Sequence, residues 1–192
     1  MAYGIKQIGI EHESAINESL RRDLERGLPL EEVEHIVNDE TRIEKLQRRL
    51  ANTADFMGLF EDGGSDLLGF SQSHEWRTGD QMPYVKGRIA RRALQVYGHL
   101  NGHRLLDPPY GIFNLGVSDN LTQREQRDVA SGLLADVLTR GFEHHDRVRV
   151  GLSEDEPLLP VFKEHGFRPI GEDGAPLEER LQLHDAERER EF

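Results

Sequence analysis

The chain has 192 residues, 36% of them hydrophobic and none of them cysteine, which suits one soluble domain and excludes disulfides, iron–sulfur clusters, thiolate zinc sites and a cysteine nucleophile. No apolar run approaches the roughly 18 residues of a membrane span, and the first residues lack the apolar stretch of a secretory signal, so we expect a cytoplasmic protein that acts away from membranes. The formal net charge of −12 at pH 7 disfavours nucleic acid as a partner and fits a cationic or amine-bearing substrate, or an acidic surface that only maintains solubility.

The first fifty residues predict one strand and two helices. Isoleucines at positions 5, 8 and 10 indicate a short strand in residues 5–10. Apolar residues then recur at helical spacing from Ser14 to a closing Gly27, and again from Leu28 to Leu50. The charged faces of these two helices are typical of solvated surface, so we assign them no chemistry.

The middle of the chain predicts a β-hairpin followed by an insertion. Residues 54–61 and 67–76 indicate two strands, because they flank the turn residues Asp62, Gly63 and Gly64. Residues 77–109 carry glycine and proline near their ends and a helical pattern in the middle, which we interpret as an insertion or lid.

The last third predicts strands and helices in alternation. The expected elements are a strand at 110–117, a helix at 129–144, a strand at 147–152, a helix at 156–165, and strands at 167–170 and 180–184. This succession predicts a mixed α/β fold in one domain, residues 1–185, with a charged tail at 186–192.

Two stretches carry a family resemblance. Val117-Ser118-Asp119-Asn120 leads through a polar run into the apolar helix pattern that begins at Asp128, and Phe162-Lys163-Glu164-His165-Gly166-Phe167 follows. This order resembles the GNAT acyltransferase superfamily, in which a strand passes through a glycine-rich turn into a helix that binds the pyrophosphate of acetyl-coenzyme A, and a later helix ends in Tyr-x-x-x-Gly-Phe.

The resemblance implies a fold and an activity. The fold would be a mixed, largely antiparallel sheet flanked by helices, with splayed central strands. The activity would be transfer of an acetyl or other acyl group from an acyl-coenzyme A to a primary amine of a small molecule or protein, without a metal. A monomer and a homodimer both stay open.

The resemblance places the phosphate-binding turn, Gln/Arg-x-x-Gly-x-Gly/Ala, on residues 125–130. Glu125 takes the Gln/Arg place and Asp128 the glycine place, so that only Ala130 conforms. In this register, or in one shifted to 127–132, Arg124 and Arg127 can reach phosphates. The alternative is a helix capped by Asp128, with solvated arginines.

The strand before this turn has a second implied role. The resemblance implies that main-chain groups at Leu115, Gly116 and Val117 pair with the pantetheine arm, whereas the alternative is a plain glycine in a buried strand. The full set of implied cofactor contacts is Leu115, Gly116, Val117, Arg124, Gln126, Arg127, Asp128, Val129, Ala130, Ser131, Asp155 and Phe162.

The acid and base positions are altered or unclear. Phe162 stands where the family has the tyrosine that reprotonates the departing thiolate, so that step would need water or another group. The alternative is that Phe162 only fills the hydrophobic core. Candidate general bases are His74 and Glu75, with Asn114 and Ser118 as further polar side chains, and the alternative is a solvent-facing His74-Glu75 pair.

Histidine pairs suggest no metal site. Gly102 weakens the helix that His99 and His103 would share, and no His-Glu-x-x-His pattern is present.

A rival function is a non-catalytic GNAT-like binding or regulatory module. Glu125, Asp128 and Phe162 support this rival, because each departs from the family's chemistry. A gap between strands four and five would favour the enzyme, whereas closed strands or a filled phosphate site would favour the module.

Overall fold

The computed structural model describes residues 3–25, 28–52, 55–75, 109–153, 156–169 and 181–187. Within these ranges the strands form one seven-stranded sheet in the order β1-β2-β3-β4-β5-β7-β6. Their bounds are β1 (Tyr3–Gln7), β2 (Phe56–Glu61), β3 (Leu67–Glu75), β4 (Tyr110–Val117), β5 (Arg147–Ser153), β6 (Arg168–Pro169) and β7 (Leu181–Glu187). Neighbouring strands are antiparallel except β4 and β5, which are parallel. The predicted mixed and largely antiparallel sheet is therefore confirmed.

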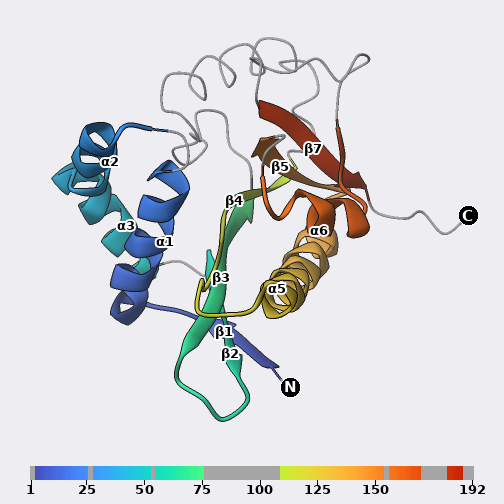
Figure 1. The fold of residues 1–192 in the computed structure, drawn as a ribbon. Helices are drawn as coiled ribbons and strands as arrows, with labels where there is room; N and C mark the ends of the chain where they lie inside the picture. The colour runs from blue at the N-terminus through green and yellow to red at the C-terminus, as the bar shows by residue number, and fades with distance from the viewer. Residues whose placement is uncertain are drawn as a thin grey trace, which may run out of the picture.

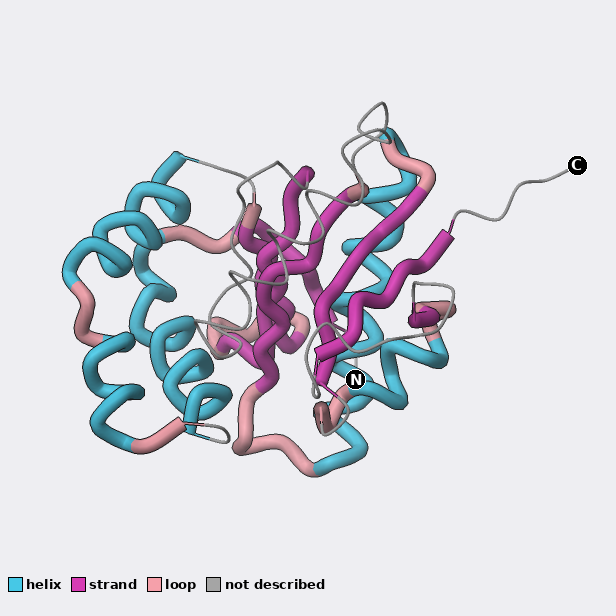
Figure 2. Tube along the Cα trace, turned by 90° about the horizontal axis from the view of Figure 1, so that it is seen from above, coloured by secondary structure: helices cyan, strands magenta, loops and turns pink. Residues whose placement is uncertain are grey.

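Helices cover both faces of this sheet (Figure 1, Figure 2). Their bounds are η1 (Ile10–His12), α1 (Glu13–Glu25), α2 (Leu30–Val37), α3 (Glu40–Asn52), α5 (Gln123–His144) and α6 (Leu159–Glu164). The helices α1, α2 and α3 lie together on one side, which we call the α1 face (Figure 1). The helices α5 and α6 lie on the other side, which we call the α5 face. In the described part of the chain, no helix has the length and apolar character that a membrane crossing requires.

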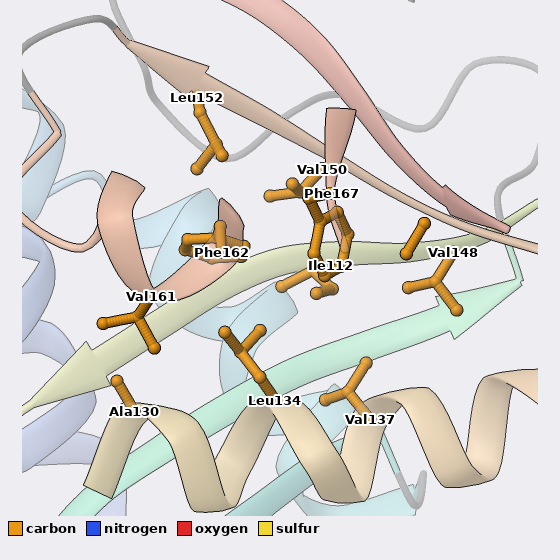
Figure 3. Close-up of a cluster of buried hydrophobic side chains, with 11 residues drawn as sticks. Ile112, Ala130, Leu134, Val137, Val148, Val150, Leu152, Val161, Phe162 and Phe167 are labelled. Carbon is orange, nitrogen blue, oxygen red and sulfur yellow. The ribbon is translucent and has the colours of Figure 1, made fainter. Parts of the chain in front are cut away.

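Each face has its own hydrophobic core, because apolar side chains alternate along the strands. On the α5 face, residues of β4, β5, α5 and α6 pack into one buried cluster (Figure 3): Ile112, Ala130, Leu134, Val137, Val148, Val150, Leu152, Val161, Phe162, Phe167 and Ala186. On the α1 face, a second cluster joins β2, β3 and the residue that directly follows β1 to α1 and α3: Ile8, Ile16, Leu50, Phe56, Phe60 and Phe70. The two clusters fix the helices on opposite sides of the strands.

The second predicted helix is wrong in one respect, because the chain breaks it into α2 and α3. Asn38 ends α2, and Asp39 then accepts a hydrogen bond from the main-chain N–H of Arg42 at 3.2 Å. A short polar side chain that bonds the next turn in this way favours the start of a new helix. The break lets α3 return toward α1, where the buried Arg42 donates to Asn17 Oδ1 at 2.6 Å.

Most other predicted elements are confirmed, with corrections at their ends. The hairpin β2–β3 and the strand at 110–117 form as predicted, whereas the first strand occupies Tyr3–Gln7 instead of residues 5–10. The predicted tail is also corrected, because β7 continues to Glu187 and Ala186 is 3% exposed. The predicted insertion at 77–109 lies outside the described residues except for Pro109.

Gly116 provides a test of how closely α1 approaches the sheet. A Cβ atom at this position would lie 2.4 Å from Phe70 Cε1 and 2.5 Å from Ser19 Oγ, so a side chain would push against α1. We expect Gly116→Ala to lower the free energy of unfolding by about 1–3 kcal/mol, as overpacking does. Urea denaturation measures the change.

The matched control is Gly4→Ala on β1, where no heavy atom beyond the neighbouring residues lies within 4 Å of the added Cβ. That variant should stay within about 0.5 kcal/mol of the wild type. Equal stability of the two variants would contradict the close packing of α1 on β4.

Candidate functional site

The central feature of the site is the separation of β4 from β5. The two strands pair at only three positions, Tyr110 with Val148, Gly111 with Arg149, and Ile112 with Val150. Beyond these pairs β4 continues to Val117 and β5 to Ser153, and the two ribbons diverge (Figure 3). The predicted splaying of the central strands is thus observed, and it begins directly after Ile112.

A β-bulge lies at the point where the two strands part. The register of β3 with β4 passes from Gln72 opposite Asn114 to Ser73 opposite Ile112, so that Phe113 is an extra residue in β4. A bulge bends the strand and re-aims the main-chain groups around it. Gly116, for which the resemblance implied pairing with the pantetheine arm, lies further along β4 in a regular pair with Phe70.

His74 lies against the bulge. Its ring stacks on that of Phe113 with a centroid distance of 4.0 Å and an interplanar angle of 10°. His74 Nδ1 is 2.8 Å from the carbonyl oxygen of Glu75, and a carbonyl can only accept, so Nδ1 carries the proton. The second nitrogen, Nε2, is then the basic one, and it lies 3.5 Å from Arg49 Nη1 of α3.

Glu75 does not share the position of His74. The two residues are consecutive in β3, so their side chains point to opposite faces of the sheet. Glu75 is exposed and pairs in register with Tyr110 at the start of β4. The structure therefore brings His74, and not Glu75, to the α1 face beside the bulge.

A row of polar and charged side chains that the sequence analysis missed crosses the sheet from His74 to Asp185. His74 is opposite Gly111, Gly111 is opposite Arg149, and Arg149 is opposite Asp185. Directly opposite residues share a face, so His74 and Arg149 lie on the same face with the side-chain-free Gly111 between them. Arg149 and Asp185 form a bidentate ion pair, Nε to Oδ1 and Nη2 to Oδ2, each at 2.7 Å.

This ion pair is buried, since its side chains are 4% and 5% exposed. Burial of either charge alone would be strongly destabilising, so the two residues depend on each other. The sequence holds a signal for the pair, because Arg149 interrupts the apolar run Val148 to Val150 and Asp185 precedes the buried Ala186.

The start of α5 differs from the prediction. The predicted helix at 129–144 begins too late, because α5 starts at Gln123 with Thr122 as its N-cap. Thr122 Oγ1 accepts from the main-chain N–H of Glu125, and the Glu125 carboxylate accepts from the main-chain N–H of Thr122 at 2.8 Å and from its hydroxyl at 2.7 Å. This reciprocal arrangement is a capping box. Its hydrogen bonds from Thr122 lower the pKa of Glu125 below its ordinary value.

Residues of the predicted phosphate-binding turn therefore lie inside a helix. Val129 and Ala130 are 0% exposed and belong to the cores of the α5 face. Asp128 is exposed on the helix surface rather than in a turn. The correction applies to both registers that the sequence allowed, because residues 125–132 are helical throughout.

Polar residues near this turn make contacts within the protein. Gln126 Nε2 donates to the carbonyl oxygen of Ser118 at 3.2 Å, which ties α5 to the end of β4. Arg127 forms an ion pair with Glu164 of α6 at 2.6 Å. Arg124 is exposed.

The contact between α5 and α6 continues at Ser131. Ser131 Oγ lies 2.7 Å from Nε2 of His165, the residue that ends α6. Burial lowers the pKa of His165, and the nearby Glu164 acts in the opposite direction. Phe162 is 2% exposed and packs edge-on against Phe167 with a centroid distance of 5.3 Å.

Three further positions considered from the sequence cannot be placed. Asp155, His99 and His103 lie outside the described residues. Across the described ranges, no three side chains of metal-ligating type come together.

The fold is that of known N-acetyltransferases. No protein-family model matches the sequence, and no curated relative matches it. Among solved structures, the PaiA N-acetyltransferase of Thermoplasma acidophilum in complex with coenzyme A matches with a TM-score of 0.63 and 14% identity, covering 98% of this chain and 100% of that chain. An agmatine N-acetyltransferase matches with a TM-score of 0.65 and 14% identity, covering 96% and 99%. A GNAT-family acetyltransferase of Listeria monocytogenes matches with a TM-score of 0.58 and 14% identity, covering 96% and 94%.

The chain therefore has the GNAT fold, and the resemblance stated from its sequence is confirmed at the level of the fold.

The contact between Ser131 and His165 predicts a pH dependence of stability. The pKa of His165 is lowered from the ordinary 6.5 in the folded state, so the unfolded chain takes up this proton first as the pH falls. The contribution of His165 is complete above about pH 6.5 and is lost as the pH falls from there through the folded-state pKa.

The variant His165→Gln keeps an amide nitrogen near the place of Nε2 and does not titrate. Urea denaturation between about pH 8 and about pH 5 should show a smaller decrease in stability for this variant than for the wild type. The control is His35→Gln on the exposed surface of α2. An unchanged pH slope in His165→Gln would contradict the assignment.

Proposed function

We propose that this protein is an N-acyltransferase that takes an acyl group from a coenzyme A thioester and transfers it to a primary amine of a small molecule or protein. The observation that carries the proposal is the separation of β4 and β5 at the bulge of Phe113. An extended arm with amide groups can lie along the edge that β4 presents there and form main-chain hydrogen bonds, as an added strand does. The similar solved structures support this proposal, since they are N-acetyltransferases and one is a complex with coenzyme A.

The chemistry requires attack by a neutral amine. The amine nitrogen forms a bond to the thioester carbonyl carbon, the carbonyl oxygen becomes an oxyanion, and the carbon–sulfur bond then breaks to release a thiolate. A main-chain N–H at the bulge stabilises the oxyanion, because the bulge re-aims these groups. Proximity of the two reactants supplies much of the remaining rate.

Three proton transfers complete this reaction. His74 accepts the proton of the ammonium substrate on Nε2, directly or through water, since Nδ1 is committed to the Glu75 carbonyl. After the carbon–nitrogen bond has formed, the nitrogen loses a second proton to water. The departing thiolate takes up a proton from water, because Phe162 has no hydroxyl with which to donate one. The acidic surface of the chain favours a cationic acceptor, whose ammonium form it attracts.

A second candidate function is a non-catalytic GNAT-like binding or regulatory module. The observation that favours it is the helical conformation of residues 125–130, where the resemblance implied a phosphate-binding turn. The buried Phe162 in place of a tyrosine points the same way.

An acyl-transfer assay separates the two candidates. Acetyl-coenzyme A is incubated with the protein and a panel of primary amines, including polyamines and peptides with a free N-terminus, and the released thiol is measured. The chain has no cysteine, so a thiol-reactive dye reports the product without a background from the protein. We expect amine-dependent thiol release. Its absence across the panel, with donor binding intact, would favour the module.

The role of His74 predicts a second result. The variant His74→Ala should lower kcat by about 100-fold or more, the usual effect of removing a general base, and should leave the KM for the donor within about twofold. The matched control is His12→Ala, which removes a histidine that packs against Phe60 elsewhere on the α1 face. Full activity of His74→Ala would contradict the role of His74 and would mean that ordered water acts as the general base.

A further inference from the structure

The two ends of coenzyme A need different binding groups. The nucleotide end carries a pyrophosphate and a 3′-phosphate, which require N–H groups and cationic side chains without competing carboxylates. The pantetheine arm is an extended chain with amide groups and a terminal thioester. An open strand edge can bind this arm through main-chain hydrogen bonds alone.

The N–H groups of residues 125 to 130, where the resemblance implied the phosphate-binding turn, are already used. Glu125 N–H donates to Thr122 Oγ1, and Gln126 N–H donates to the Thr122 carbonyl oxygen at 2.8 Å. Further along α5, each N–H donates to the carbonyl four residues earlier, as in any α-helix. The N–H groups of Asp128, Val129 and Ala130, where the resemblance implied the phosphate site, therefore serve the helix.

Arg124 at the start of α5 is exposed, but other groups there already have carboxylates beside them. The ionised Glu125 carboxylate already occupies the position at the positive end of the helix where a phosphate would bind. Arg22 is held in an ion pair by Asp119, which follows β4. Arg127 is held in the same way by Glu164. Each of these guanidinium groups therefore has a carboxylate beside it that an incoming phosphate would meet.

The groups that would bind the arm are retained. β4 extends five residues past its last pair with β5, from Phe113 to Val117, and the bulge lies at the start of this stretch. This stretch of β4 is fixed from behind by its pairing with β3, so the edge toward β5 is preformed.

We propose that this protein recognises its acyl donor through the pantetheine arm in the opening between β4 and β5 and gains little affinity from the nucleotide. The donor class is then any acyl thioester of pantetheine, whether the other end of the pantetheine arm carries the coenzyme A nucleotide or a different group. This inference rests on the proposed function, and it narrows the donor chemistry of the same site.

Calorimetric titration with separate parts of the donor tests the inference without knowledge of the acceptor. The probes are coenzyme A, reduced pantetheine, and adenosine 3′,5′-bisphosphate, which represents the nucleotide end. We expect coenzyme A and pantetheine to bind with Kd values within about threefold of each other. Adenosine 3′,5′-bisphosphate should neither bind nor compete.

Hydrogen exchange locates the site independently of activity. Pantetheine and coenzyme A should both slow amide exchange in peptides that cover β4, and neither should change exchange in peptides that cover Thr122 to Ala130. The double variant Arg124→Ala, Arg127→Ala should alter the Kd of coenzyme A by less than about twofold, whereas a working phosphate site would lose about tenfold or more.

Three results would overturn the inference. Coenzyme A binding about 100-fold more tightly than pantetheine, which equals about two charge-assisted hydrogen bonds, would show a working nucleotide site and leave the proposed acyl transfer intact. Competition by adenosine 3′,5′-bisphosphate would lead to the same conclusion. Absence of binding by coenzyme A and by pantetheine would overturn both the inference and the proposed function.

Discussion

The structure depends on a short parallel ladder between two halves of one sheet. Strands β1 to β4 form one half, strands β5, β7 and β6 form the other, and three residue pairs between β4 and β5 join them. So few main-chain hydrogen bonds cannot hold the halves together alone, and α5 supplies the rest. Val129 and Leu133 of this helix pack with Leu59 of β2, while Leu134 and Val137 lie in the cluster that contains β5. Helix α5 thus holds together the two halves of the sheet that border the opening.

The same helix determines what the opening can bind. Extension of α5 back to Gln123 makes residues 125–130 helical and buries Val129 and Ala130 against the sheet, where the resemblance implied a phosphate-binding turn. The extension stabilises the helix through a capping box and through the contacts of its first turns with α6. The stability of this helix start and an anion site at residues 125–130 exclude each other, because both use the same N–H groups.

Much of the fold could be predicted from local patterns, and the errors have physical causes. The hairpin of β2 and β3 follows from Asp62-Gly63-Gly64, and Gly63 indeed has a positive φ of 73°. The break between α2 and α3 was missed, because the apolar spacing continues through Asn38 and Asp39 while a side-chain cap interrupts the backbone. The start of α5 was misplaced because the resemblance outweighed Thr122 and Glu125, whose three-residue spacing before an apolar run is itself a helix-start signal.

The candidate site was predictable only in part. His74 and Glu75 are consecutive in a predicted strand and so point to opposite faces, but only the structure shows that His74 is the one beside the bulge. The bulge at Phe113 has no sequence signal, since most residues can occupy such a position and only the pairing with β3 reveals it. The roles of these residues in binding and catalysis stay predictions.

The position of β7 has a consequence for how the molecule assembles. β7 follows β6 in the chain and yet lies between β5 and β6, so neither neighbour can complete its hydrogen bonds until β7 has entered. Arg149 lacks the carboxylate of Asp185 until β7 has paired with β5. The two residues are 36 positions apart in the chain. The chain between the two residues must therefore close into a loop before the ion pair can form. The second half of the sheet, with one wall of the opening, is complete only once β7 is in place.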